Sequence, residues 1–146
     1  MSGFDTSRLM AGTACAAACL ALPAVIAPHA QAAVSPTLSV TMGGSALGAA
    51  RLAAVGCPQT ATARVTMPDG SPVTGGFVDF FSRLPGVAGN TVGTAPVHDG
   101  TASIPWVPDI EGQHIVSGVY YGGPAGVRTT AGYTTITTVD TGGVCA

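Results

Sequence analysis

Residues 75–122 read GGFVDFFSRLPGVAGNTVGTAPVHDGTASIPWVPDIEGQHIVSGVYYG, and this stretch decides the fold. Its first run, Phe77 to Ser82, begins as an alternation of two faces. Val78 and Phe80 share one face, and the other face carries Phe77, Asp79 and Phe81. A period of two is typical of a β-strand with one buried face. We therefore predict a half-buried strand here.

Two further runs surround the dipeptide Asp99-Gly100: Val92 to His98 and Thr101 to Trp106. An Asp-Gly pair accepts the positive φ angles of a type I′ turn, so we predict a β-hairpin. The last run, His114 to Tyr121, is rich in β-branched and aromatic residues and ends at Gly122. The stretch as a whole predicts strands joined by glycine, proline and Asp-Gly turns.

The alternation continues outside this stretch, in Pro36 to Met42, Gln59 to Met67 and Thr129 to Val139. In the last segment Ile136 breaks the parity of Tyr133 and Val139, which favours a β-bulge there. The alanine-rich segment Gly43 to Val55 leaves three alternatives open: a loose turn, a short helical turn or an edge strand. About seven short strands are expected in all.

Three pieces of the chain carry a family resemblance: GGFVDF from Gly75, VGTAPVHDGTASI from Val92 and EGQHIVSGVYYG from Glu111. They resemble the bacterial Ig-like repeat domains of secreted and cell-surface proteins. The resemblance extends over about Pro36 to Val139 and is tightest in residues 75–122. It implies an all-β, immunoglobulin-like β-sandwich of antiparallel strands, with a binding or structural role, because such domains serve as spacers, adhesins and binders alike. The segment Ser82 to Thr91 is longer than the connection usual in that family.

The first 32 residues have the pattern of a cleavable signal peptide. Arg8 precedes an apolar run from Leu9 to Ala27, and Ala30-Gln31-Ala32 fits a small-x-small cleavage site. We predict residues 1–32 as signal peptide and 33–146 as one Ig-like domain, secreted or associated with the cell envelope. An uncleaved membrane anchor is the alternative, since about 20 apolar residues suffice to span a bilayer.

Charge excludes one class of partner. Without the signal peptide, 114 residues (146 minus 32) carry four arginines, no lysine and six carboxylates, a net charge of −2. Nucleic-acid binding needs a concentrated basic surface, which four scattered arginines do not form. Charged residues make up only 8% of the chain, so threonine, serine, glycine and apolar side chains must cover much of the surface. Such a surface suits a wall-associated or partner-covered protein.

Cleavage would remove two of the four cysteines and leave Cys57 and Cys145. An exported domain with two cysteines is expected to form one disulfide. In an immunoglobulin-like strand order, both cysteines lie at the same pole of the sandwich. The bridge would close a loop of 89 residues (57 through 145), which stabilises the fold by about 4 to 5 kcal/mol in the chain-entropy model.

The predicted faces leave large apolar side chains outside the sandwich. The family pattern turns Trp106, Val116 and Tyr120 inward. The outward positions then carry Phe77, Phe81, Ile115, Val119 and Tyr121. These five form a candidate binding face on the order of several hundred Å², which is large enough to indicate a partner site. The alternative is that Leu84, Pro85 and Val87 of the long loop cover it.

We expect no enzymatic activity, metal or cofactor. His98 and His114 are the only bases near neutral pH after cleavage, and both occupy turn or strand-start positions typical of exposed or capping histidines. Asp109 and Glu111 lack the ligand spacing of a calcium loop. Two roles remain: a binding module for an extracellular protein or glycan, through the outer face or the 82–91 loop, and a structural or self-associating envelope protein. Membrane attachment is expected only if the signal segment stays uncleaved.

Overall fold

The computed structural model describes residues 32–44 and 51–145, so the predicted signal peptide lies outside the described residues apart from Ala32. Residues 31–146 form one compact unit. No helix in the described ranges is long and apolar enough to cross a membrane. The strands are β1 (Thr37–Gly43), β2 (Leu52–Ala54), β3 (Gln59–Thr66), β4 (Phe77–Arg83), β5 (Asn90–Pro96), β6 (Thr101–Trp106), β7 (Gly112–Tyr121) and β8 (Thr130–Val139).

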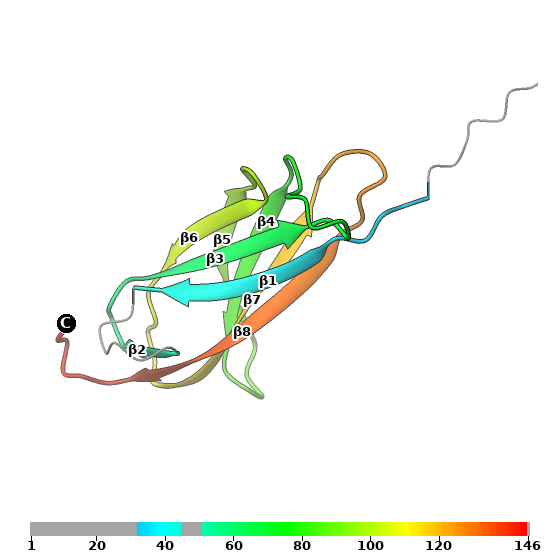
Figure 1. Cartoon of the computed structure of the whole chain (residues 1–146). Coiled ribbons are helices and arrows are strands. Elements are labelled where there is room, and N and C mark those ends of the chain that lie inside the picture. Colours follow the sequence, from blue (N-terminus) through cyan, green and yellow to red (C-terminus); the bar gives the residue numbers. More distant parts are fainter. Residues whose placement is uncertain (1–31, 45–50, 146) are drawn as a thin grey trace, which may run out of the picture. The chain divides into compact units, whose positions relative to one another are not determined.

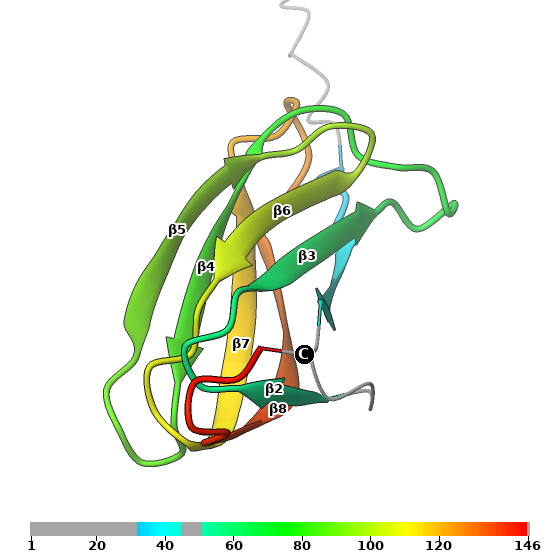
Figure 2. The ribbon, with the colours of Figure 1, turned by 90° about the vertical axis from the view of Figure 1, so that its left-hand side faces the viewer.

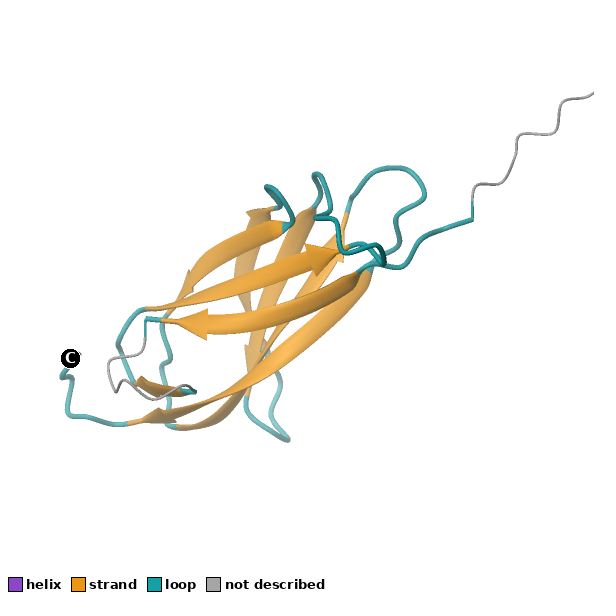
Figure 3. Ribbon diagram, in the orientation of Figure 1, coloured by secondary structure: helices purple, strands orange, loops and turns teal. Residues whose placement is uncertain are grey.

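The strands form two facing sheets (Figures 1 and 3). One sheet has the order β1-β3-β6, and the other has the order β2-β8-β7-β4-β5. If the strands are lettered as in immunoglobulin domains, the first sheet is A-B-E and the second contains G-F-C-C′, so the fold is an immunoglobulin-like β-sandwich. The all-β prediction is confirmed.

The prediction of about seven antiparallel strands is wrong in one respect. The described residues contain eight strands, because part of the ambiguous segment forms β2, which pairs in parallel with β8. Leu52 lies opposite Thr137 and Ala54 opposite Val139. This short strand covers the outer edge of β8, whose other edge pairs with β7. Residues 45–50 of the same segment lie outside the described residues.

Alternation of side chains builds the core, as expected for strands with one buried face. In β3 the buried positions are Gln59, Ala61, Ala63 and Val65. In β7 every second side chain from His114 to Tyr120 is buried. The interior between the sheets is filled mainly by small and branched residues around a few aromatic rings: Val40, Val65, Val78, Phe80, Trp106, Val116, Tyr120 and Ile136. Trp106 is only 5% exposed, so it is a core residue, as predicted.

The predicted turn at Asp99-Gly100 is confirmed, but the prediction that the two flanking strands pair as a hairpin is wrong. Asp99 and Gly100 have φ angles of 50° and 72°, and His98 and Thr101 exchange two backbone hydrogen bonds of 2.9 Å. Beyond this pair β5 and β6 separate into different sheets. They separate because both strands turn their apolar sides toward the same interior from opposite layers, which a flat hairpin cannot do.

The bulge expected at Ile136 is also wrong. The β7–β8 register runs without interruption, Ile136 is 1% exposed, and Tyr133 is 71% exposed. The two residues therefore face opposite sides, which is what their spacing of three requires in a regular strand. The register shift occurs between β4 and β5 instead, where Phe80 pairs with Gly93 and Phe81 with Thr91. Val92 is the extra residue of that bulge.

A disulfide joins the last described turn to the start of β3. Cys57 and Cys145 are bonded with their Cα atoms 5.5 Å apart. Near them, the amide of Gly56 donates a 2.8 Å hydrogen bond to the carbonyl of Pro108. Figure 2 shows β2, the C-terminal tail and the loops after β4 and β6 gathered at this end of the sandwich, which we call the disulfide pole.

Candidate functional site

Strand register decides which residues share the outer face of the larger sheet. Directly paired residues point to the same side. Phe77 pairs with Tyr121, and Phe81 pairs with Ser117. Successive outward positions on β4 and β7 therefore bring Phe77, Phe81, Ile115, Val119 and Tyr121 onto one surface, which we call the outer face. The predicted grouping of side chains on one side of the sheet is present.

The exposure of the outer face is uneven. Phe77 is 47% exposed and Tyr121 is 37% exposed, and their rings stack with centroids 6.1 Å apart. The side chains of Phe81, Ile115 and Val119 are half-buried. The apolar surface that the described residues present is therefore concentrated at the Phe77–Tyr121 end.

Two hydroxyl groups donate hydrogen bonds to the Asp79 carboxylate beside the Phe77–Tyr121 pair. The Tyr121 hydroxyl donates a 3.1 Å hydrogen bond to Asp79 Oδ1, and the Thr94 hydroxyl donates to the same oxygen. Desolvation, followed by the hydrogen bond and negative charge of Asp79, raises the pKa of Tyr121 above its ordinary value of 10.0. The network orients the Tyr121 ring beside the Asp79 carboxylate.

Tyr133 is an outer-face residue that the sequence reasoning missed. It pairs with Ser117 and thus lies on the far side of β7 from Phe81. With Arg83 and Ile115 it borders a shallow pocket of about 190 Å³. The signal that finds it is the alternation within β8, because Tyr133 lies three residues before the inward-facing Ile136 and therefore points outward.

The segment Ser82 to Thr91 consists of a six-residue loop, residues 84–89, with two strand residues on each side of it. Ser82 pairs with Asn90, so only Leu84 to Gly89 connects β4 to β5. Leu84 and Val87 line a pocket at the disulfide pole, and Val87 is 57% exposed. Phe77 and Tyr121 remain open in the part of the chain that the structure describes, so the loop does not cover that end of the outer face.

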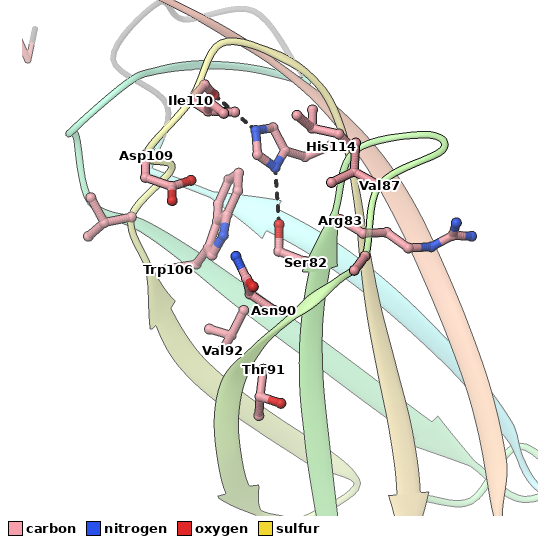
Figure 4. Close-up of a pocket in the computed structure, with 13 residues that line it drawn as sticks. Ser82, Arg83, Val87, Asn90, Thr91, Val92, Trp106, Asp109, Ile110 and His114 are labelled. Atoms are coloured by element: carbon pink, nitrogen blue, oxygen red, sulfur yellow. Dashed lines mark hydrogen bonds between the residues drawn. The ribbon is translucent and has the colours of Figure 1, made fainter.

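The pocket at the disulfide pole has a volume of about 250 Å³ and lies between the ends of four strands (Figure 4). We call it the pole pocket. Ser82 of β4, Asn90 and Val92 of β5, Trp106 of β6 and His114 of β7 all reach it. The bulge in β5 contributes here, because the extra residue Val92 lines the pocket. The other lining residues are Arg83, Leu84, Val87, Ala88, Thr91, Val107, Asp109 and Ile110.

His114 contradicts its predicted exposed or capping position. It is 4% exposed, and its ring meets the edge of Trp106 with centroids 5.3 Å apart. Nε2 lies 3.0 Å from the Ile110 carbonyl, and Nδ1 lies 3.1 Å from Ser82 Oγ. A carbonyl only accepts, so Nε2 carries the proton, and in the neutral ring Nδ1 accepts from the Ser82 hydroxyl. The parity of β7 predicts this inward position, because His114 is two residues before Val116.

Of the other titratable candidates, Asp109 lines the pole pocket, whereas His98 and Glu111 do not. His98, Asp109 and Glu111 are exposed. No group of three or more His, Cys, Asp or Glu side chains close enough to hold a metal ion occurs within residues 32–44 and 51–145. What the structure brings together is one serine–histidine pair whose second ring nitrogen is held by a backbone carbonyl.

No family model matches this sequence, and no curated protein matches it. Similar solved structures include the CARDB domain of the PF1109 protein from Pyrococcus furiosus, crystallised in complex with di-metal ions, at 14% identity over 71% of this chain and 89% of that chain, with a TM-score of 0.40. Its solution structure aligns over 73% and 97% with a TM-score of 0.44. The PKD domain of an M14-like peptidase from Thermoplasmatales archaeon SCGC AB-540-F20 is 11% identical over 72% and 94%, with a TM-score of 0.36. The fold assignment rests on the strand order described above.

Proposed function

We propose that this chain is an exported, non-enzymatic binding module that holds an extracellular protein or glycan on its outer face. The observation that carries the proposal is the register of β4 and β7, which assembles Phe77, Phe81, Ile115, Val119 and Tyr121 on one side of the sheet. Large contiguous apolar patches on a protein surface often mark partner sites. Stacked aromatic rings with a hydroxyl at the edge suit a partner that is partly apolar and partly polar.

The non-enzymatic part of the proposal is supported by how Ser82 and His114 are placed. Ser82 is 8% exposed and lies on the inner side of β4. An activated serine needs access to substrate and donors for the developing oxyanion as well as a base. The pair acts instead as a buried polar link between β4, β7 and the loop after β6. Covalent labelling of Ser82 by a fluorophosphonate probe would contradict this assignment.

Affinity capture from the native extracellular fraction tests the binding face. The wild type, Phe81→Asp and Thr60→Asp are compared, because Thr60 is an exposed residue of β3 in the opposite sheet and receives the same charge. We expect Phe81→Asp to lose partners that the wild type and Thr60→Asp both retain, with an unchanged melting temperature. Retention of the same partners by all three proteins removes the outer face from consideration. Loss of stability in Phe81→Asp indicates a structural rather than a binding role for this residue.

A structural or self-associating envelope protein is the second candidate. It is favoured by the same open Phe77–Tyr121 pair, which is able to bury itself against another copy. Sedimentation at increasing protein concentration separates the two candidates, because self-association needs no ligand. A monomer throughout the range, together with ligand capture, supports the binding module.

A further inference from the structure

The pole pocket and the outer face are separate surfaces. Ser82 points inward to the pocket, whereas its neighbours Phe81 and Arg83 occupy outward positions of β4. The pocket therefore opens at the end of the sandwich, between the two sheets, and none of the five outer-face residues lines it. A ligand in the pole pocket and a partner on the outer face would occupy different places.

Size limits what the pole pocket can take. A volume of about 250 Å³ is below the range of roughly 300 to 1,000 Å³ that is usual for sites of drug-sized ligands. The pocket thus accommodates about one ring with its substituents. Since it opens at the end of the sandwich, that ring can be the terminal unit of a longer chain that extends into solvent.

The walls are held in place without a ligand. The Ile110 carbonyl accepts hydrogen bonds from both His114 Nε2 and the Thr138 hydroxyl, at 3.0 and 2.6 Å. The Gly56 amide holds the neighbouring Pro108 carbonyl. The loop after β6 is thereby tied to β7, β8 and the segment that carries the disulfide. A preformed site loses less entropy on binding than one that must be ordered first.

The polar groups that remain available are planar and face an aromatic ring. Asn90 and Asp109 direct their side chains to the space beside the Trp106 indole (Figure 4). The structure records no hydrogen bond for either side chain with the residues it describes. An amide offers donors and acceptors, and a carboxylate offers two acceptor oxygens, a combination that matches adjacent hydroxyl groups. Trp106 is 5% exposed, so only a small part of its indole forms the apolar floor of the pocket, against which the carbon-bound hydrogens of a ring can pack.

The charges around the pole pocket narrow the class of ligand further. Asp109 brings a negative charge to the pocket, whereas the Arg83 guanidinium extends away from it in Figure 4. Both ring nitrogens of His114 are already engaged. An anionic ring would place like charges together with no cation to compensate. We propose that the pole pocket binds one neutral sugar residue, at the end of a glycan chain.

Trp106 provides the readout, because it is the only tryptophan of the chain. The oxidised protein is titrated with methyl glycosides of neutral hexoses and N-acetylhexosamines while tryptophan fluorescence is recorded. We expect a saturable change with at least one of them. Asp109→Ala and Asn90→Ala should each weaken that binding about tenfold, the effect of one hydrogen bond to a charged or amide group. Both residues are exposed, so the melting temperature should stay unchanged.

Thr60 is exposed on β3 and does not line the pocket, so Thr60→Asp is the control and should bind the sugar as the wild type does. The proposal is overturned if none of the neutral glycosides gives a saturable change, if only charged rings do so, or if both pocket variants bind as tightly as the wild type. None of these results bears on the outer face, whose test uses captured partners rather than fluorescence. The two assignments therefore stand or fall separately.

Discussion

The outer face and the pole pocket share strand β4, yet they arise in different ways. Phe81 contributes to one and Ser82, the next residue, to the other. The outer face is made by two neighbouring strands of one sheet, with side chains repeating every second residue. The pole pocket needs four strand ends and two loops, and both sheets contribute to it. A surface made by one sheet can be read from alternation, whereas a cavity between sheets depends on how the layers meet.

The disulfide lies at the same end of the sandwich as the pole pocket. Removing it should therefore affect the pole pocket more than the outer face, and it is the prediction with the largest expected effect. Cys57→Ser with Cys145→Ser should lower the free energy of unfolding by about 4 to 5 kcal/mol, because the bond joins residues 88 positions apart. Urea denaturation of the oxidised wild type and the double variant measures the difference. We also expect the double variant to lose sugar binding, measured by tryptophan fluorescence, at a lower urea concentration than it loses binding at the outer face. A difference below about 1 kcal/mol contradicts the stabilising role.

His114 tests whether the pocket wall depends on its polar links. His114→Phe keeps a ring of similar size but removes hydrogen bonds to Ser82 and to the Ile110 carbonyl. The Ser82 hydroxyl is then left unpaired, which should cost about 1 to 3 kcal/mol of unfolding free energy, whereas the Ile110 carbonyl keeps its hydrogen bond from Thr138. Denaturation measures this cost, and Phe81→Ser on the outer face is the comparison. Equal stability of His114→Phe and the wild type would show that the links contribute little.

Gly132 and Tyr133 are adjacent residues of β8 on opposite sides of the sheet. A methyl group on Gly132 would overlap the Leu38 carbonyl of β1, so Gly132→Ala should destabilise the fold by about 1 to 3 kcal/mol. Gly43→Ala is a suitable control, because no neighbouring atom lies within 4 Å of its added carbon. Tyr133→Ser should leave thermal stability nearly unchanged. Similar losses for Gly132→Ala and Gly43→Ala would contradict the close approach of β1.

The smallest expected effect concerns the pKa of Tyr121 on the outer face. Desolvation and Asp79 raise this pKa above 10.0, so the folded state favours the protonated hydroxyl. The resulting stabilisation is present below pH about 10 and is lost as the pH rises through the folded-state pKa. Ultraviolet titration of the wild type and Tyr121→Phe isolates this residue. Asp79→Asn should lower the pKa but leave it above 10.0, because desolvation is the larger cause; an unchanged pKa contradicts a contribution from Asp79.

Much of the sandwich and of the outer face could be predicted because both depend on local alternation. Strand parity puts Val78 and Phe80 on one face, and the family pattern turned Trp106 inward; all three are buried. The candidate site at the pole could not be predicted in the same way. Ser82 and His114 are 32 residues apart and meet only through the β4–β7 pairing. Parity would still have placed His114 inside the domain, but it does not identify the groups that surround it.

The sequence by itself determined an all-β chain, the two faces of most strands and a turn with positive φ at Asp99-Gly100. These are local properties, because the pleat of a strand sends successive side chains to opposite sides. Only the tertiary structure decided that β5 and β6 part into different sheets, that β2 joins β8 in parallel, and that Trp106, His114 and Asn90 surround one pocket. Pairing and register depend on contacts between distant segments, and these contacts are set by how the two layers bury their apolar sides together.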